Sequence, residues 1–194
     1  MSFTGDILNK VREYAKSAEK PERYEHSVRV AETARKMCDI YGEDPDKGYF
    51  TGLAHDICKD LDDDTQISLA QEDGQEITEL ERKKPFLLHG RAAAIKLQKD
   101  FGVNDPDVIQ AVANHTFGGI GFCKLAKIIF AADKIEPGRP QSTEEYRREL
   151  FSKPLDQMAL AVLQMQIDFL VSRGKEVAPV SYIFKDSLMG GDGQ

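Results

Sequence analysis

The chain of 194 residues lacks a long hydrophobic run, and its first ten residues, Met1 to Lys10, are polar. A membrane-spanning helix needs about 18 or more apolar residues, and a signal peptide needs an apolar stretch near its start. Neither pattern occurs. We therefore expect a soluble, cytoplasmic protein with no membrane partner.

Cysteine is scarce: Cys38, Cys58 and Cys123 are odd in number and show no C-x-x-C spacing. This pattern is typical of reduced, partly buried thiols in a cytoplasmic protein. The chain is 41% hydrophobic, which is enough to bury a core without disulfides. We predict a single domain over residues 1–189 and a disordered tail over residues 190–194.

The chain also lacks an excess of positive charge, because 26 Lys and Arg residues are outnumbered by 33 Asp and Glu residues, for a net charge of -7. Such a composition argues against general binding to duplex nucleic acid. A small anion remains compatible with it if metal ions or a focused cationic cluster bind that anion. We therefore expect a small-molecule partner and no nucleic acid.

Alternating strand patterns bounded by hairpin signals are absent, whereas helical periodicity and helix-capping residues recur throughout. The sequence therefore predicts an all-α fold. Proline at helix starts, Asp, Ser or Thr at N-caps and Gly at helix ends mark the expected boundaries. The expected helices cover about 6–18, 21–41, 45 to the His55-Asp56 pair, Asp64 or Thr65 to near Gly74, 86–101, 106–115, 122–135, a segment after a Ser142–Glu145 capping box, 154–174, and a short stretch after Pro179.

The sequence has four histidines, and all lie in segments expected to be helical: His26, His55, His89 and His115. Taken alone, a histidine on an apolar helix face is more often a hydrogen-bonded core residue than a ligand. Two carboxylates change this interpretation. Asp56 follows His55 directly, and Asp133 lies in an otherwise apolar helix, where an unpaired carboxylate is costly to bury. Because imidazoles mixed with carboxylates suit iron, manganese or zinc, we predict a shared metal site.

The motifs around these residues resemble those of the HD-domain metal-dependent phosphohydrolases, which have a separated His, an adjacent His-Asp pair and a distant Asp. They are RYEHSVRV, GLAHDICKDL and FAADKIEPGR, and LLHGRAAA and VANHTFGG supply the two further histidines of the dinuclear branch. The resemblance runs from about Pro21 to the last helices. It is closest to the bacterial HD-domain diadenosine tetraphosphate hydrolases.

The resemblance implies an HD-domain helical bundle that cleaves diadenosine tetraphosphate into two ADP by attack of a metal-bound hydroxide. The implied ligands divide between two metals, with Asp56 as bridge and catalytic carboxylate: His26, His55 and Asp133 on one metal, His89 and His115 on the other. Iron is the metal that the resemblance favours. The ligand chemistry alone also admits manganese, cobalt, nickel or zinc. Two divalent ions with two ionised aspartates leave the site at about +2, which attracts a polyphosphate.

Cations near these motifs are candidates for phosphate binding. Lys59 lies one helical turn after His55, and if the helix continues it can act as a catalytic phosphate clamp. An exposed lysine is the equal alternative from spacing alone, and the HD-x-x-K form favours function. Arg139 fits the family pattern, whereas Lys134 is explained by the helix dipole and surface solvation.

Four other polar residues near the histidines are candidates for substrate contact: Asn114, Thr116, Arg23 and Arg91. Asn114 and Thr116 flank His115 and suit phosphate oxygens, but they are equally typical of caps and turns. The two arginines are weaker candidates. For the nucleoside base, Phe86 and Phe117 are candidates for stacking, with burial in the core as the alternative.

Other functions compete with this interpretation. The nearest is an HD phosphohydrolase acting on a nucleoside monophosphate, a deoxynucleotide or a cyclic nucleotide. A di-iron oxygenase and a non-catalytic nucleotide-binding module are further alternatives. Retention of all six candidate ligands speaks against the non-catalytic module, and the sequence leaves the oligomeric state open.

Overall fold

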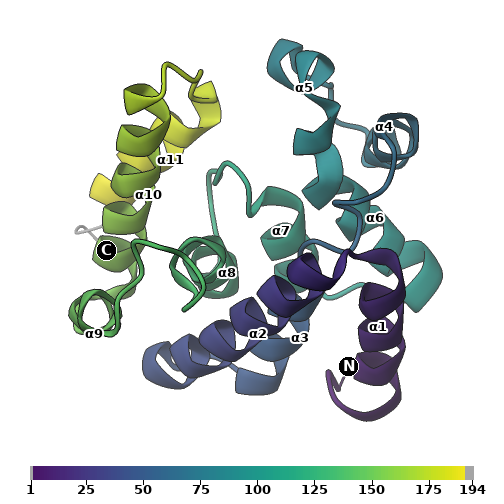
Figure 1. The fold of residues 1–194 in the computed structure, drawn as a ribbon, viewed down its shortest axis with the longest axis horizontal. Coiled ribbons are helices and arrows are strands. Elements are labelled where there is room, and N and C mark those ends of the chain that lie inside the picture. Colours follow the sequence, from purple (N-terminus) through teal and green to yellow (C-terminus); the bar gives the residue numbers. More distant parts are fainter. Residues whose placement is uncertain (1, 191–194) are drawn as a thin grey trace.

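Helices make up all the regular secondary structure of residues 2–190, the part of the chain that the computed structural model describes. No strand occurs in this part, which confirms the all-α prediction (Figure 1). None of its helices is long and apolar enough to cross a membrane. The predicted disordered tail lies outside the described residues except for Gly190.

The helices follow one another as a chain of α-helices with one short 3₁₀ helix. They are α1 (Gly5–Ala18), α2 (Pro21–Tyr41), α3 (Pro45–Ala54), α4 (Asp63–Gln71), α5 (Glu79–Lys83), the 3₁₀ helix η1 (Pro85–Leu88), α6 (His89–Phe101), α7 (Pro106–Asn114), α8 (Lys124–Ile135), α9 (Glu144–Phe151), α10 (Leu155–Ser172) and α11 (Pro179–Met189).

Helix starts and stops mostly follow the predicted capping residues. Proline occupies the first turn of α2, α3, α7 and α11, as expected. The carboxylates of Asp44 and Asp105 accept hydrogen bonds from backbone N–H groups at the starts of α3 and α7. Gly42 ends α2 in the left-handed conformation, with φ of 72°.

The predicted capping box at Ser142 and Glu145 is corrected. Thr143, not Ser142, caps α9, because the Ser142 hydroxyl is already used to donate to the carbonyl oxygen of Ile135. A complete capping box instead joins Thr78 and Glu81 at the start of α5. That helix has only five residues, too few to produce a periodic pattern, so the sequence did not predict it.

Other helix boundaries also differ from prediction. Asp62, rather than Asp64 or Thr65, caps α4, and the helix ends at Gln71 instead of near Gly74. Helix α8 begins at Lys124 instead of residue 122, because the side chain of Cys123 caps the helix by accepting a hydrogen bond from Ala126 N–H. At the end of α3, the helix stops at Ala54, so the His55-Asp56 pair lies just beyond it.

A continuous core extends from Phe3 to Leu188 and includes the fully buried rings of Phe50, Phe130 and Phe184. Helix α8 contacts α2, α3, α7 and α10, which places it at the centre of the packing (Figure 1). The C-terminal helices α10 and α11 pack against each other on one side, and α4 packs against α6 on the other. The single domain over residues 1–189 stays a prediction.

Two glycines allow the close helix packing on which the site depends. A Cβ atom on Gly52 would lie 2.7 Å from Ala31 Cα, so glycine lets α3 approach the backbone of α2. A Cβ atom on Gly90 would lie 2.8 Å from the carbonyl oxygen of Val112, so glycine also lets α6 approach α7. Each contact draws a histidine-bearing helix end toward its neighbour.

The three cysteines are free thiols, as predicted. Cys38 and Cys58 are buried, and Cys123 is partly buried. Burial raises the pKa of Cys38 and of Cys58 to about 12. Both thiols therefore stay protonated and pack as small apolar groups.

Glu19, immediately after α1, makes the stability of the fold depend on pH. Its side chain is only 6% exposed, and burial raises its pKa to about 7. The folded protein therefore holds this proton to a higher pH than the unfolded chain does. Ionisation weakens the fold as the pH rises from about 4.5 through 7, and the penalty is absent below that range.

We expect Glu19→Gln to raise the free energy of unfolding at pH 8 by up to about 3 kcal/mol and to leave it unchanged near pH 4.5. A glutamine retains the hydrogen bond from Ser27 and removes the buried charge. Thermal unfolding at both pH values measures the effect, with Glu13→Gln on the exposed face of α1 as control. An equal shift of Tm at the two pH values would contradict this explanation.

Candidate metal centre

The six predicted metal ligands come together at one place, although they are spread over more than 100 residues of the sequence. They are contributed by α2, the segment after α3, the first residue of α6, the residue after α7, and the last turn of α8: His26, His55, Asp56, His89, His115 and Asp133. Three overlapping triads from this set have ligand atoms within 4.8 Å of one another. The six residues thus form a single cluster, which we call the histidine–aspartate cluster.

Backbone carbonyl groups fix the orientation of three histidines. The Nδ1 atoms of His55, His89 and His115 each donate a hydrogen bond to the carbonyl oxygen three residues earlier, at 2.7, 2.8 and 2.8 Å. Because a carbonyl oxygen only accepts, each Nδ1 carries the proton and each Nε2 keeps its lone pair. This is the arrangement that presents Nε2 to a metal.

Burial keeps these three histidines neutral, since it lowers the pKa of His55 to about 4 and also lowers the pKa values of His89 and His115. A neutral imidazole is the form that binds metals. All three side chains are at most 2% exposed. The cluster therefore has three shielded nitrogen ligands in their metal-binding state.

The Nε2 atoms fit a cation between them. Among the described residues, buried His55 Nε2 has no hydrogen-bond partner. The Nε2 atoms of His89 and His115 lie 2.9 Å apart. Two lone pairs at this distance repel each other, whereas neighbouring ligands at right angles on a metal with bonds of about 2.1 Å are about 3 Å apart. The donor set therefore fits a transition metal.

Asp56 lies at the centre of the cluster. Its Oδ1 atom is 3.1 Å from His89 Nε2, 3.5 Å from His115 Nε2 and 3.7 Å from His55 Nε2. Its other oxygen, Oδ2, lies 3.2 Å from the guanidinium of Arg23, and this opposite charge favours the ionised form of the carboxyl. One ionised oxygen therefore faces nitrogens from both sides of the cluster.

His26 is held between two carboxylates. Its Nε2 lies 3.1 Å from Asp133 Oδ1, and its Nδ1 lies 3.1 Å from Glu136 Oε1. Burial would lower the pKa of His26, but hydrogen bonds with Asp133 and Glu136 outweigh burial and raise it to about 9. A metal binding to His26 Nε2 must therefore displace a proton.

Sequence reasoning missed Glu136, which directs the ring of His26. Its carboxylate is almost fully buried, and it accepts hydrogen bonds from Arg29 at 2.6 Å and from the N–H of Gly138. Burial would raise its pKa, but His26 and Arg29 outweigh burial and lower the pKa to about 2. Its position three residues after Asp133, within one helical turn, was the available signal.

We expect Glu136→Gln to weaken metal binding or activity by about 10- to 100-fold, the usual loss when a residue that orients a ligand is changed. The amide keeps the size of the side chain but removes the charge that orients His26. Metal titration of the metal-free protein measures the loss, and exposed Glu145→Gln is the control. An unchanged affinity in Glu136→Gln would mean that Glu136 serves only the packing of α8.

Three predicted phosphate-binding cations lie against the cluster. Arg23 NH1 is 3.2 Å from Asp56, Arg139 NH2 is 2.7 Å from Asp133, and Lys59 Nζ is 2.9 Å from His89 Nδ1. Lys59 reaches this position by a route other than the expected one, because residues 55–60 form turns instead of a continued helix. The side chains of all three are partly buried.

Asp60, in the acidic segment after Lys59, is largely shielded from solvent. Asp60 is only 11% exposed in its side chain and accepts a hydrogen bond from Arg23 Nε at 2.8 Å. The backbone N–H of Lys20 donates to the same carboxylate. Asp60 thereby holds Arg23 at the mouth of the cluster, a role that the sequence analysis did not assign to it.

Two weaker expectations are corrected. Arg91 is directed away from the cluster and pairs with Asp73 and Glu81, so it supports the packing of α6 instead of binding substrate. Lys134 is only 8% exposed, and its Nζ donates to the His115 carbonyl oxygen at 2.8 Å. It is therefore a buried link within the site, because α8 faces the core at this position.

Asn114 and Thr116 have different environments. Asn114 donates to the carbonyl oxygen of Gln110, as expected of an ordinary helix-end residue. Thr116 has a buried hydroxyl with no hydrogen-bond partner among the described residues, and its carbonyl oxygen accepts from Gln166. Thr116 is therefore the better candidate of the two for a hydrogen bond to substrate.

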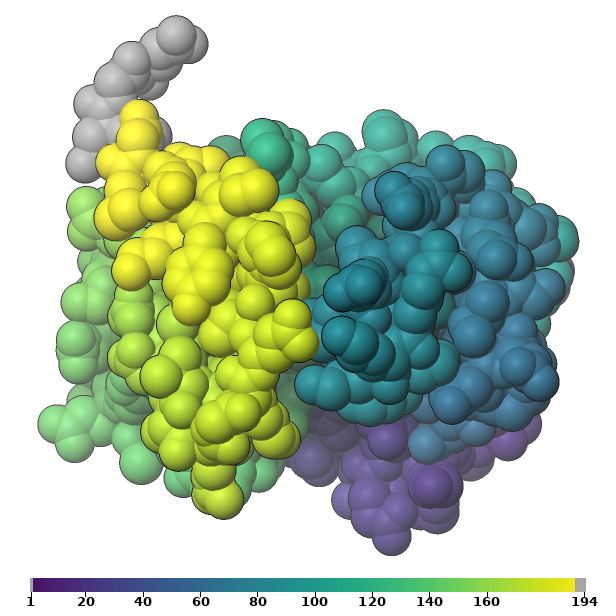
Figure 2. Space-filling view, turned by 90° about the horizontal axis from the view of Figure 1, so that it is seen from above, coloured from purple at the N-terminus to yellow at the C-terminus, as the bar shows by residue number. Residues whose placement is uncertain are grey.

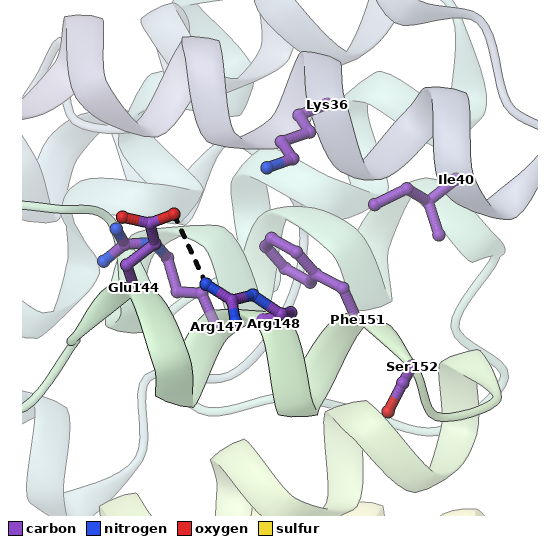
Figure 3. A pocket seen from close by; sticks show the side chains of 7 residues that line it. All are labelled: Lys36, Ile40, Glu144, Arg147, Arg148, Phe151 and Ser152. Atoms are coloured by element: carbon purple, nitrogen blue, oxygen red, sulfur yellow. Dashed lines mark ion pairs between the residues drawn. The ribbon is translucent and has the colours of Figure 1, made fainter.

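A surface cleft of about 580 Å³ lies apart from the cluster, between α2 and α9 (Figure 3). It is lined by basic residues and an aromatic ring, among other side chains: Lys36, Arg147, Arg148 and Phe151. Arg148 forms an ion pair with Glu144 across 3.5 Å. None of the six predicted ligands lines this cleft.

Comparison with known proteins agrees with this geometry. The HD domain family model matches residues 23–138, which include the six residues of the cluster. The chain is 34% identical over 170 residues to a symmetrical bis(5'-nucleosyl)-tetraphosphatase from Staphylococcus aureus, covering 86% of each chain. It is 28% identical over 169 residues to the protein of that name from Bacillus subtilis, covering 87% of this chain and 90% of the relative.

A solved structure shares the whole architecture. It belongs to a protein from Clostridium acetobutylicum described as a predicted HD superfamily hydrolase involved in NAD metabolism. The two chains superpose with a TM-score of 0.86 and are 31% identical, over 94% of this chain and 96% of the other. The chain therefore belongs to the HD domain family, and it is an HD-domain phosphohydrolase.

Proposed function

We propose that the protein hydrolyses diadenosine tetraphosphate symmetrically into two ADP at the histidine–aspartate cluster. The observation that carries this proposal is the central position of Asp56 Oδ1, between 3.1 and 3.7 Å from three histidine Nε2 atoms. The names of the relatives from Staphylococcus aureus and Bacillus subtilis support the choice of substrate.

We propose that the cluster holds two metal ions, divalent or mixed-valence. His26, His55 and Asp133 would hold one ion, His89 and His115 would hold the second, and Asp56 would contact both. The 3.1 Å approach of His26 Nε2 to Asp133 and the 2.9 Å approach of His89 Nε2 to His115 Nε2 support this division. Iron is the first choice, and manganese, cobalt, nickel and zinc have suitable chemistry for the same ligands.

When bound, the metals supply a nucleophile at neutral pH and neutralise charge on the attacked phosphoryl group. Arg23, Lys59 and Arg139 bind the phosphate oxygens, because they are the cations beside the cluster and the chain as a whole has a net charge of -7. Their positions concentrate positive charge where a polyphosphate is attacked.

Other residues keep the site in order during the reaction. Lys134 joins Asp133, whose Oδ2 lies 3.3 Å from its Nζ, to the carbonyl oxygen of His115. This contact ties a proposed ligand of one metal to the segment that carries a ligand of the other. Thr116 offers its free hydroxyl as a further hydrogen-bond donor to phosphate.

Product analysis tests the proposal. Protein loaded with iron, manganese or cobalt under controlled oxygen is incubated with diadenosine tetraphosphate, and the nucleotides are separated by chromatography. We expect ADP as the only product. ATP with AMP would overturn the cleavage position. Turnover of a nucleoside monophosphate, a deoxynucleotide, a cyclic nucleotide or NAD in place of diadenosine tetraphosphate would move the protein to another phosphohydrolase activity.

A further inference from the structure

Phe86 in η1 has an exposed side chain, although its backbone carbonyl group orients His89 in the cluster. The ring is 49% exposed, whereas the carbonyl oxygen accepts a hydrogen bond from His89 Nδ1 at 2.8 Å. Within the described residues, its ring forms no aromatic pair. Large aromatic side chains are usually buried. An exposed ring this close to His89, a proposed metal ligand, is therefore a candidate for binding substrate.

Lys59 connects the ring to the cluster. Its Nζ lies 5.6 Å from the centre of the Phe86 ring and 2.9 Å from His89 Nδ1. Phosphates bound at the cluster and by Lys59 place the sugar and base of a nucleotide farther out. The Phe86 ring is exposed and lies next to Lys59, the cation that would neutralise these phosphates.

The surface is hollowed on this side of the molecule. Figure 2 shows a furrow between α11, in yellow, and the segment from α4 to η1, in blue. Hydrogen bonds from Gln166 and Ser181 to the carbonyl oxygens of Thr116 and Phe117 hold the segment after His115 against α10 and α11. Residues next to His115 and next to His89 are thus attached to opposite walls of the furrow.

The second aromatic candidate, Phe117, is less suitable. It is partly buried, and its carbonyl oxygen is occupied by the hydroxyl of Ser181 at 2.8 Å. The ring of Phe86 is the more exposed of the two and is the one that lies beside a phosphate-binding candidate, Lys59.

We propose that Phe86 stacks against a base of the nucleotide substrate and makes the site prefer nucleoside polyphosphates over inorganic polyphosphates. This rests on the proposed function insofar as the ligand is a nucleotide. Every base presents a flat π-face, so stacking on Phe86 selects a nucleoside without selecting which base. Phosphate binding by Lys59 and base binding by Phe86 are separate contributions, and they can be measured separately.

The α2–α9 cleft supplies a matched control. There Lys36 Nζ lies 5.5 Å from the centre of the Phe151 ring, nearly the same arrangement as Lys59 and Phe86 (Figure 3). This cleft contains none of the proposed metal ligands. A response at Phe86 that is absent at Phe151 therefore reports the site and not a lysine–phenylalanine pair in general.

The chain contains no tryptophan, so Phe86→Trp and Phe151→Trp each create a protein with a single fluorescent indole. The zinc-loaded proteins are titrated with ADP and, separately, with inorganic tripolyphosphate. We expect ADP to quench the fluorescence of Phe86→Trp and tripolyphosphate to leave it unchanged, while Phe151→Trp responds to neither. Equal responses of Phe86→Trp to both ligands would overturn the proposal.

Calorimetry on Phe86→Ala tests the same contact without a probe. We expect ADP to bind about 10-fold or more weakly, the loss typical of one base stack, with tripolyphosphate affinity and metal content unchanged. Phe86→Tyr should retain ADP affinity because it keeps the ring. Unchanged ADP affinity in Phe86→Ala would refute the proposal, and equal weakening of ADP and tripolyphosphate would refute it by assigning the effect to the phosphate site.

This experiment separates the inference from the proposed function. ADP binding is measured without turnover, so a failure to hydrolyse diadenosine tetraphosphate refutes the proposed substrate while the quenching by ADP still supports Phe86. Conversely, symmetrical hydrolysis together with unchanged ADP binding in Phe86→Ala refutes the role of Phe86 alone.

Discussion

Replacing Asp56 with asparagine is expected to lower hydrolysis by at least about 100-fold, because several kcal/mol of charge stabilisation depend on the metals. The ionised Oδ1 atom lies within 3.7 Å of the Nε2 atoms of His55, His89 and His115. An amide is neutral and cannot replace this charge between the two proposed metal ions. We therefore expect Asp56→Asn to lose both metals as well as activity.

Metal content by mass spectrometry and initial hydrolysis rates measure this result. Asp46→Asn is the control, since Asp46 is an exposed residue whose carboxylate pairs with Arg35 on the surface. His89→Ala is expected to lose mainly one metal, because the proposed division assigns His89 to one metal alone. Full metal content with normal turnover in Asp56→Asn would contradict the bridging role.

Removing the metals is expected to lower Tm by about 10 °C for each metal site. This value holds when the free metal concentration had been about a thousand times the Kd of that site. Such saturation stabilises the fold by about 4 kcal/mol, and each kcal/mol changes Tm by about 2–4 °C in a chain of this size. The apolar core does not depend on the metals, so the metal-free protein should remain folded. Thermal unfolding with and without a chelator measures the difference.

The difference in Tm between the metal-loaded and the metal-free protein should grow as the pH rises from 6 to 8. The pKa of His26 is raised to about 9, so below that pH its proton competes with the metal. The same proton stabilises the metal-free fold at low pH, and that stabilisation is lost as the pH rises through 9. His89→Ala should keep this dependence of Tm on pH, because the pKa of His89 is lowered and His89 carries no proton that competes with a metal in this range. A Tm that is independent of metal at every pH would contradict the account.

The residues of the histidine–aspartate cluster could be predicted because each follows from a local pattern. A His-Asp dipeptide at a helix end and an aspartate in the apolar α8 stand out in the sequence before any contact is known. Proline and aspartate predicted the starts of α3 and α7, although His55 and His115 lie just after these helices and not within them. The all-α fold followed from the same local signals.

Contacts between segments that lie far apart in the chain could not be predicted from local sequence patterns. Glu136 resembles any exposed residue at a helix end until α2 brings His26 and Arg29 against it. Lys134 had an adequate local explanation in the helix dipole, and only the packing of α8 reveals that it is buried. Arg91 lies only two residues after His89, but its helical position turns it toward Asp73.

The most direct test of the central claim is hydrolysis of diadenosine tetraphosphate by the metal-loaded protein in water enriched in oxygen-18. The account predicts ADP as the only nucleotide product, with one labelled oxygen in one of the two ADP molecules from each cleavage. We also expect Asp56→Asn to lower the rate of this reaction by at least about 100-fold. ATP with AMP, or ADP formation at an unchanged rate in Asp56→Asn, would contradict symmetrical hydrolysis at the histidine–aspartate cluster.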